Sequence, residues 1–394
     1  MSFLSNIYIF VCLVAGIPLA MFTVECIVGS LRRNTREDNA VIPPRPKVGI
    51  LIPAHNEEDV IEKTLSSLQK QVSESDRVLV VADNCSDTTA DIVRSFNFEV
   101  DERTHDTNRG KGFALAHGLE NFSQDPPDIV IILDADCLLG ENALDQLVYH
   151  CATTQSPVQC QYLIKSAAPA KTTTKVSEFA VFIKNRIRML GLSRLGASVH
   201  LSGTGMAFPY ESLVNADLAS GEIVEDMKLG IDLAIAKQKV QFIDHVEVES
   251  FFPTTDAALA KQRERWEHGH MGMIQRYAPK LLASSVTTMN PKLLLLLLDL
   301  IIPPLAFLIT LILGLSIFGA GLWLITGNTL LLLLPSSLFL IALFTTLFTW
   351  ALNARHILSS SELISLPIYV FKKIGSYFKF FSNREQKWVK TDRK

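Results

Sequence analysis

The stretch Asp128-Ile-Val-Ile-Ile-Leu-Asp134-Ala-Asp136 decides the fold class of this chain of 394 residues. A continuous apolar run that ends in acids is typical of a strand buried on both faces of a parallel sheet. Two further strands of this kind are predicted over residues 48–53 and 77–83. Helical spacing of apolar residues predicts helices over residues 57–71, 87–96, 111–122 and 142–151. This alternation predicts an α/β domain with a parallel sheet covered by helices on both faces.

Polar segments follow the three predicted strands, where parallel sheets bind their ligands. They are Pro53-Ala-His55-Asn-Glu57, Asp83-Asn-Cys-Ser-Asp87 and Asp134-Ala-Asp136. No GxGxxG follows the first strand and no GxxxxGK[ST] occurs, which argues against a dinucleotide-binding Rossmann site and a P-loop. A nucleotide, if one binds, is therefore expected to be held by acids and a metal ion.

The pair Asp134 and Asp136 has the spacing of a site for a divalent cation. Two carboxylates at a strand end can share a hard cation, whose coordination shell diphosphate oxygens complete. The alternative is a strand that ends in solvated acids, with Asp136 capping a helix. Asp83 can accept a hydrogen bond from a base N–H or a ribose hydroxyl, but the segment from Asp83 to Asp87 is also ordinary turn and N-cap chemistry.

Three acidic residues lie between Gly221 and a helix that is predicted over residues 227–238. Glu222, Glu225 and Asp226 lie at its start, where negative charge interacts favourably with the helix dipole. That explanation suffices for Glu222 and Glu225. Asp226 could instead face a cleft and act as a general base.

The segment Gln262-Arg-Glu-Arg265-Trp266 lies on a helix predicted over residues 257–277. Arginines there can stabilise a leaving diphosphate, and Trp266 can form an apolar wall or stack on a sugar. The alternative is a basic helix face near lipid headgroups. Ser202-Gly203-Thr204-Gly205 either lets a substrate approach the backbone closely or is a plain turn before a strand.

The composition indicates contact with lipid, because 48% of the residues are apolar, 20% are charged and the mean hydropathy is +0.25. Residues 7–24 are uncharged and just long enough to span a bilayer, and Arg32, Arg33 and Arg36 follow them. We expect an uncleaved anchor with a cytoplasmic C-terminal side rather than a cleaved signal peptide. Residues 300–354 contain no charge, and Gly327-Asn328 divides them into a hairpin of two spans.

Basic residues follow this hairpin, so both of its ends are expected in the cytoplasm. Residues 363–381 are apolar but contain three lysines, which favours an interfacial or re-entrant helix. Residues 175–194 form either another interfacial helix or a core-packed one. The expected division is an anchor (1–31), a cytoplasmic catalytic domain with interfacial helices (32–292), a transmembrane hairpin (293–354) and a basic tail (355–394).

The net charge and the spacing of the cysteines argue against other classes of protein. A net charge of −3 is too close to neutral for a nucleic-acid binder that relies on bulk electrostatics. The six cysteines form no CxxC pair, so neither a zinc ribbon nor a disulfide scaffold is indicated.

The ordered motifs resemble those of the membrane-bound family 2 glycosyltransferases, which include cellulose, chitin and hyaluronan synthases and ceramide glucosyltransferase. The family pattern is an aspartate after the second strand, then DxD, ED and QxxRW. Asp83, Asp134-Ala-Asp136, Glu225-Asp226 and Gln262-Arg-Glu-Arg-Trp266 match all four. The resemblance covers roughly residues 45–280 and the flanking spans, and it implies a GT-A fold, Mg²⁺ or Mn²⁺, a nucleotide-diphospho sugar donor and inversion by direct displacement.

The resemblance also implies roles for individual residues. It places the nucleotide sugar against Pro53, His55, Glu57, Asp83, Lys111 and Asp134. It assigns the metal to Asp134 and Asp136, acceptor contacts to Gly203, Thr204, Gly205 and Glu225, and the general base to Asp226. Gln262, Arg265 and Trp266 are implied to close over the diphosphate and the acceptor. The segment from Ser202 to Gly205 departs from that of cellulose synthase, which leaves the acceptor open.

These features predict an inverting glycosyltransferase of the cell (inner) membrane, multi-pass, that acts in surface polysaccharide or glycolipid synthesis. A UDP-sugar is the expected donor and a lipid-linked or saccharide molecule the expected acceptor, with membrane lipid and no nucleic acid as partners. Three spans favour limited transfer, or a synthase that needs partner subunits for export, over a self-contained processive synthase. The competing class is a non-catalytic membrane assembly subunit.

Overall fold

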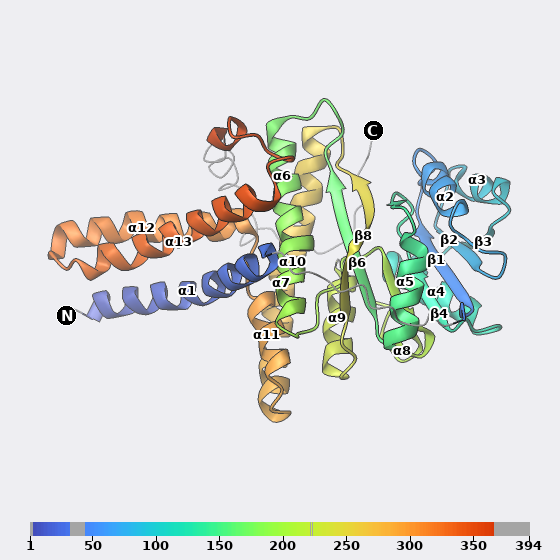
Figure 1. Cartoon of the computed structure of the whole chain (residues 1–394), viewed down its shortest axis with the longest axis horizontal. Helices are drawn as coiled ribbons and strands as arrows, with labels where there is room; N and C mark the ends of the chain where they lie inside the picture. The colour runs from blue at the N-terminus through green and yellow to red at the C-terminus, as the bar shows by residue number, and fades with distance from the viewer. Residues whose placement is uncertain (1–2, 32–43, 221, 223, 366–394) are drawn as a thin grey trace. The chain divides into compact units, whose positions relative to one another are not determined.

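The computed structural model describes residues 3–31, 44–220, 222 and 224–365. The chain forms two compact units, each assembled from separate segments (Figure 1). Among the described residues, unit 1 comprises 3–31, Ser166–Gly196 and 256–365, and unit 2 comprises 44–165 and the described part of Ala197–Thr255. The expectations for Arg32, Arg33 and Arg36, and those for residues 366–381, lie outside the described residues.

Unit 2 is built on an eight-stranded sheet with the order β3-β2-β1-β4-β7-β6-β8-β5. Its strands are β1 (Val48–Ala54), β2 (Arg77–Asp83), β3 (Glu99–Arg103), β4 (Ile129–Ile132), β5 (Leu138–Leu139), β6 (Val158–Lys165), β7 (Met206–Pro209) and β8 (Gln241–Phe251). Its helices are α2 (Ile61–Gln69), α3 (Thr89–Ser95), α4 (Lys111–Phe122), α5 (Ala143–Thr154), α8 (Tyr210–Val214) and α9 (Glu225–Ile235).

The sheet is mixed rather than wholly parallel. Strands β3, β2, β1 and β4 are parallel, as the sequence predicted for the three of them that it identified. The prediction is wrong for the other half, because β7 runs antiparallel to both β4 and β6, and β5 runs antiparallel to β8. The physical reason lies in the chain before β7, where Thr204 Oγ1 accepts a hydrogen bond from Asp134 N beyond the end of β4. The chain therefore enters β7 at the carboxyl end of β4 and runs back along it.

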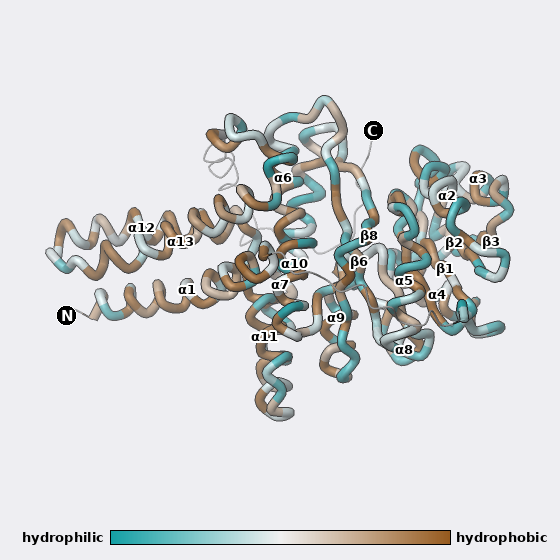
Figure 2. Tube along the Cα trace, viewed as in Figure 1, coloured by the Kyte–Doolittle hydropathy of each residue, from teal (hydrophilic) through white to brown (hydrophobic). Residues whose placement is uncertain are grey.

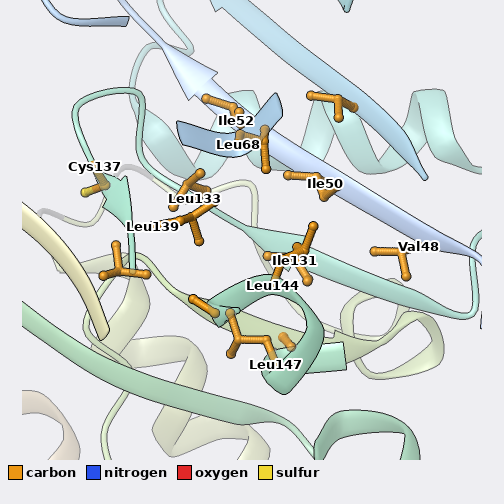
Figure 3. Close-up of a cluster of buried hydrophobic side chains, with 14 of the residues drawn as sticks. Val48, Ile50, Ile52, Leu68, Ile131, Leu133, Cys137, Leu139, Leu144 and Leu147 are labelled. Atoms are coloured by element: carbon orange, nitrogen blue, oxygen red, sulfur yellow. The ribbon is translucent and has the colours of Figure 1, made fainter. Parts of the chain in front are cut away.

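Helices cover both faces of the parallel strands. Alternate residues of β1, including Ile50 and Ile52, point into a buried cluster that Leu144 and Leu147 of α5 also enter (Figure 3). Leu51 points to the opposite face, which α4 covers. At Gly118 the two elements are so close that an added Cβ would lie 2.2 Å from Leu51 Cδ1. The expected helix–sheet–helix layering is confirmed around β1.

Unit 1 is helical in its described residues. Its elements are α1 (Phe3–Ser30), α6 (Thr172–Phe182), a π-helical segment (Ile183–Arg188), α7 (Met189–Arg194), α10 (Asp256–Thr287), α11 (Pro291–Leu300), α12 (Leu305–Thr326), α13 (Leu330–Asn353) and a 3₁₀ turn (Glu362–Ser365). The helix expected over residues 175–194 is therefore interrupted by a π-helical segment.

Three helices of unit 1, α1, α12 and α13, are long and apolar enough to cross a membrane. Apolar residues predominate along all three (Figure 2). Helix α13 packs against both α12 and α1. The break between α12 and α13 falls at Gly327, whose φ of +68° favours glycine. The helices lie where the sequence placed its three spans.

The close approach of α4 to β1 at Gly118 predicts how one added methyl group changes the stability of the fold. Gly118→Ala should lower the free energy of unfolding by about 1–3 kcal/mol, because the new Cβ displaces Leu51 in a packed core. Denaturant titration of the purified protein measures this. Gly314→Ala is the matched control, since a Cβ there meets nothing within 4 Å and helix propensity favours alanine. Equal effects of both substitutions would contradict the packing argument.

Candidate active site

The parallel pairing brings the three polar segments to one edge of the sheet. Since β1 lies between β2 and β4, the residues after all three strands are neighbours. His55 Nδ1 lies 2.6 Å from the carbonyl oxygen of Asp83. The backbone N–H of Glu57 donates to Thr89 Oγ1 at 2.8 Å, and Pro53 is aligned with Val81 of β2. The first two segments thus form one connected structure.

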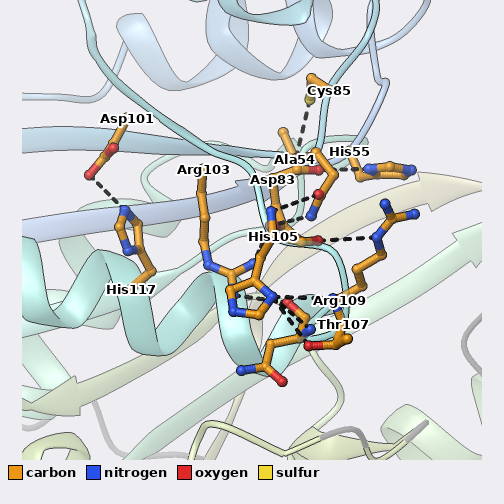
Figure 4. A network of polar contacts seen from close by, with 12 residues as sticks. Ala54, His55, Asp83, Cys85, Asp101, Arg103, His105, Thr107, Arg109 and His117 are labelled. Atoms are coloured by element: carbon orange, nitrogen blue, oxygen red, sulfur yellow. Dashed lines mark hydrogen bonds and ion pairs between the residues drawn. The ribbon is translucent and has the colours of Figure 1, made fainter.

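Asp83 is buried and is held in part by an arginine from a strand that the sequence did not predict (Figure 4). Its Oδ1 accepts hydrogen bonds from Arg103 Nη1 at 2.5 Å and from Asn84 Nδ2 at 2.9 Å. Arg103 Nη2 also donates to the carbonyl oxygen of Asn108 at 2.9 Å, which fixes the loop between β3 and α4. Sequence reasoning missed Arg103 because β3 reads Glu-Val-Asp-Glu-Arg and has no apolar run.

Lys111, the first residue of α4, lies among acids from two other elements. Its Nζ is 2.5 Å from Asp134 Oδ1 and 3.9 Å from Glu225 Oε1, and it donates to the carbonyl oxygen of Gly203 at 2.7 Å. Burial alone would lower the pKa of Lys111, but the charges of Asp134 and Glu225 outweigh burial and raise it. Lys111 is therefore a permanent cation that links α4, the segment after β4 and α9.

Gly203 marks the point at which these groups converge. A Cβ added there would lie 3.2 Å from Lys111 Nζ, 3.4 Å from Asp226 Oδ2 and 3.9 Å from Asp134 Oδ2. The φ of +93° at Gly203 also favours glycine. Asp226 Oδ1 accepts from the N–H of Met227 at 2.8 Å, so Asp226 has one oxygen on its own helix and the other beside Gly203. The structure thus brings together residues from the DxD, the ED and the glycine segment.

The glycine segment is fixed by a buried side chain of β6. Gln159 Nε2 donates to the carbonyl oxygen of Thr204 at 2.9 Å, and its Oε1 accepts from the N–H of Ser202 at 2.8 Å. Gly205 has a φ of +62°, and a Cβ there would lie 2.4 Å from Cys160 Sγ. Sequence reasoning missed Gln159, although a glutamine between the apolar residues Val158 and Cys160 signals a polar partner inside the fold.

Asp134, Asp136 and Cys137 offer three ligand atoms that lie within 4.8 Å of one another. Burial raises the pKa of the Cys137 thiol, and Cys137 Sγ donates to Asp136 Oδ1 at 3.6 Å. The two carboxylates are the oxygen ligands that Mg²⁺ and Mn²⁺ prefer. The residues present therefore fit a hard divalent cation.

A small pocket that is partly open to solvent lies beside Lys111, Glu225 and Asp226 in unit 2. Its lining combines charged and apolar side chains from α4, β7, α9 and the segment before α9: Lys111, Gly112, Leu115, Met206, Asp217, Leu218, Glu225, Asp226 and Leu229. Burial raises the pKa of Glu225 to about 7; Lys111 opposes this shift, whereas Asp226 adds to it. Glu225 therefore changes charge near neutral pH, which sequence reasoning did not foresee.

The QxxRW residues lie on α10, in unit 1. Gln262 is buried, and Arg265 and Trp266 are half-buried. Arg263, between them, donates from Nη1 to Ser177 Oγ of α6 at 2.7 Å. The helix expected over residues 257–277 is confirmed and extends to Thr287. Closure of Gln262, Arg265 and Trp266 over a diphosphate stays a prediction.

Comparison with known proteins gives the family. The model of the glycosyltransferase-like family 2 matches residues 44–269, more than half of the chain. The chain belongs to glycosyltransferase family 2. It is 27% identical over 262 residues to poly-β-1,6-N-acetyl-D-glucosamine synthase of Staphylococcus aureus, covering 62% of this chain and 61% of that protein. It is 39% identical over 99 residues to the probable glycosyltransferase YdaM of Bacillus subtilis, covering 23% of each.

The solved structures show the same fold. The mannosyltransferase PcManGT of Pyrobaculum calidifontis, solved in complex with GDP-Man and Mn²⁺, superposes with a TM-score of 0.57 at 18% identity over 96% of this chain and 99% of that one. The protein is thus a glycosyltransferase with a GT-A fold and three helices apolar enough to span a membrane. The chain matches about three-fifths of the length of the S. aureus synthase and about a quarter of YdaM.

The raised pKa of Glu225 predicts how stability depends on pH. A carboxyl group with a pKa of about 7 in the folded state and 4.5 in the unfolded state favours folding below pH 4.5, and this contribution is lost as the pH rises to 7. Glu225→Gln cannot ionise, so the free energy of unfolding of the variant relative to wild type should increase across this window. Denaturant titrations at several pH values measure the difference. Glu211→Gln, at an exposed position of α8, is the control and should leave the pH profile unchanged.

Proposed function

We propose that this family 2 glycosyltransferase moves a sugar from a nucleotide-diphospho sugar, most simply a UDP-sugar, to a lipid-linked or saccharide acceptor during surface polysaccharide or glycolipid synthesis. The observation that carries the proposal is the convergence of Lys111, Asp134 and Asp226 around Gly203. A carboxylate that fits a divalent cation, an ammonium group and a further carboxyl group beside a partly open pocket are the groups that glycosyl transfer from a diphosphate needs.

In this proposal the nucleotide lies along the edge formed by β1, β2 and β4. Asp83, whose Oδ1 is held by Arg103 and Asn84, receives the base or ribose together with the segment from Pro53 to Glu57. Asp134 and Asp136 would hold Mg²⁺ or Mn²⁺, which neutralises diphosphate charge when bound. Lys111 adds a positive charge on the side of Gly203.

In the proposed transfer step, Asp226 accepts the proton of the acceptor hydroxyl group. The acceptor hydroxyl oxygen forms a bond to the anomeric carbon while the bond from that carbon to the diphosphate oxygen breaks, so the configuration inverts. Asp226 Oδ2 takes the hydroxyl proton, and the nucleoside diphosphate leaves with the bonding electron pair. Gly203, Thr204, Gly205 and Glu225 would contact the acceptor. Gln262, Arg265 and Trp266 would close over the leaving diphosphate.

We propose that the protein is a multi-pass protein of the inner membrane. Helices α1, α12 and α13 would cross the bilayer, with residues 32–292 as the cytoplasmic catalytic domain, residues 293–354 as the hairpin and residues 355–394 as a basic tail. The apolar character of the three helices supports this arrangement. A cytoplasmic active site would meet its nucleotide sugar where such donors are made.

A second candidate is processive synthesis of a polysaccharide, with partner subunits for export. The similarity to poly-β-1,6-N-acetyl-D-glucosamine synthases supports it. Incubation of the purified protein in lipid vesicles with labelled sugar nucleotides, followed by sizing of the products, separates the two. Single-sugar products support limited transfer, and a ladder of long polymer supports processive synthesis. Saturable nucleotide binding without any transfer would overturn both.

Asp226→Asn should reduce kcat by about 10²- to 10⁴-fold, since the amide keeps the shape but cannot take a proton. Affinity for the nucleotide sugar, measured by isothermal titration calorimetry, should change little because Asp83, Asp134 and Asp136 remain. Asp232→Asn, on the solvent-facing side of the same helix, is the matched control and should retain activity. Near-normal kcat in Asp226→Asn would leave this residue a role at the helix start only.

Asp136→Ala should abolish binding of Mn²⁺, measured by electron paramagnetic resonance of the free ion in the presence of UDP. Activity should fall with it, and excess chelator should inactivate the wild-type enzyme without unfolding it. Asp125→Ala, an exposed acid on the segment before β4, should bind Mn²⁺ normally. Full activity of the wild-type enzyme in chelator would contradict the metal role.

A further inference from the structure

Strands β6 and β8 of unit 2 carry a face that the catalytic proposal does not use. The two strands pair side by side (Figure 1). Three residues of β6 lie opposite three of β8: Gln161 opposite Glu247, Leu163 opposite Glu249, and Lys165 opposite Phe251. Because successive side chains of a strand point to opposite faces, these six share one face, which we call the β6–β8 face. Val248 and Ser250, which alternate with its residues on β8, are buried.

The β6–β8 face continues from the candidate active site. Gln159 of β6, which fixes the glycine segment, is paired with Met206 of β7, and Met206 lines the pocket beside the catalytic acids. Gln161 follows Gln159 by two residues, so it lies on the same face about 7 Å further along the strand. By the same count Phe251, opposite Lys165, lies about 20 Å from Gln159. A molecule bound beside the glycine segment therefore has a continuous strand surface along which to extend.

The charged side chains of this face hold one another in place. Gln161 Nε2 donates to Glu247 Oε2 at 3.0 Å. Lys165 Nζ forms an ion pair with Glu249 Oε1 and lies 3.8 Å from Glu247 Oε1. The side chains of Lys165 and Glu247 are each 38% exposed and that of Glu249 is 20% exposed, so a ligand in solution can reach all three. The face thus presents oriented carboxyl oxygens, which are hydrogen-bond acceptors.

Gln161 adds an acceptor that lacks a donor. Its side chain is buried, and its Oε1 has no hydrogen-bond donor among the residues that the structure describes. A buried acceptor without a donor is costly, and its cost is relieved when a donor binds. The amide of Gln161 lies against Glu247. A ligand that suits this position therefore carries donors, such as hydroxyl groups.

Phe251 supplies an apolar surface next to these acceptors. Its side chain is 46% exposed, although it lies on the same strand face as Glu247 and Glu249. A sugar ring has hydroxyl groups around its rim and apolar C–H groups on its faces. An aromatic ring can pack against such a face while carboxyl and amide oxygens accept from the rim.

Other ligand classes fit this face less well. A phosphate group would meet the carboxyl oxygens of Glu247 and Glu249, which repel an anion, and only one ammonium group, that of Lys165. A lipid chain would cover the same carboxyl groups without giving them hydrogen-bond partners. The chemistry of the face therefore selects a neutral ligand that is rich in hydroxyl groups.

We propose that the β6–β8 face binds a saccharide part of the acceptor, beyond the sugar that reacts. This inference rests on the proposed transfer reaction and names the class of acceptor, a sugar chain. Gln161, Glu247 and Glu249 accept hydrogen bonds from its hydroxyl groups, and Phe251 packs against the C–H face of a ring. Lys165 orients the two acids. Changes on this face therefore weaken binding of the acceptor and leave binding of the nucleotide unchanged.

Direct binding of saccharides tests this without any transfer. The probes are β-1,4- and β-1,6-linked hexamers of glucose and of N-acetylglucosamine, titrated calorimetrically into the detergent-solubilised full-length protein with no nucleotide sugar present. At least one hexamer should bind. Its dissociation constant should rise by about fivefold or more in Phe251→Leu, which loses the ring, and in Glu247→Gln, which loses the charge. Phe251→Tyr keeps the ring and should bind as wild type does.

Two substitutions elsewhere in unit 2 are matched controls. Val214→Ala removes part of an exposed apolar side chain of α8, and Glu99→Gln removes the charge of another ion-paired acid of the same sheet. Both should bind the hexamer as wild type does, and every variant should bind UDP with Mn²⁺ equally well. Midpoints of thermal unfolding report the fold of each variant. Since Phe251 is exposed, Phe251→Leu decides the test if Glu247→Gln is unstable.

Three results would overturn the proposal. The first is that no hexamer binds to wild type, and the second is that Phe251→Leu and Glu247→Gln bind the hexamer normally. The third is that Phe251→Leu weakens binding of farnesyl phosphate but not of the hexamer, which would assign the face to a lipid phosphate. Failure of the proposed function would look different. UDP binding or sugar transfer would then be absent, whereas the saccharide titrations, made without a donor, would be unaffected.

Discussion

The ion pairs of Lys111 are the interaction on which the candidate active site depends. Asp134, Glu225 and Asp226 come from two elements and would repel one another without a cation between them. The same ammonium group donates to the carbonyl oxygen of Gly203, so one charge sets the distance between the DxD, the ED and the glycine segment. The site is therefore largely organised before any substrate binds, which is the condition for electrostatic stabilisation during transfer.

The mixed sheet supplies the other constraint. Parallel strands bring their carboxyl ends to one edge, which explains why the segments after β1, β2 and β4 meet. The segment before an antiparallel strand reaches that same edge from the opposite direction. Strand β7 is antiparallel to β4, so Thr204 can bond to Asp134 and Gly203 can lie among the acids. A wholly parallel sheet would have placed the start of β7, and with it the glycine segment, at the other edge.

The parts of the fold that the sequence predicted are those with local periodicity. Apolar runs identified β1, β2 and β4, and helical spacing identified α4 to the residue. Strand β3 and the pairing of β6 with β8 were not predicted, because their polar residues are satisfied by partners far away in the chain. Arg103 with Asp83 and Gln159 with Thr204 are such pairs. Motif order located Asp134 and Asp226, but only the structure shows that Lys111 and Gly203 lie between them.

Each unit gathers carboxyl groups around a cation, and the two sites differ in access to water. In unit 2 the side chains of Lys111 and Asp134 are 18% and 27% exposed, so a cation from solvent can reach the surplus negative charge. In unit 1 the side chain of Glu25 is 0% exposed and glycine contacts close the backbone around it. A hydrated metal ion cannot enter there without displacing helices, and the ion pairs of Arg188 with Glu25 and Asp299 instead join α1, the π-helical segment and α11. Access to water therefore suits the acids of unit 2 to a divalent cation and those of unit 1 to holding helices together.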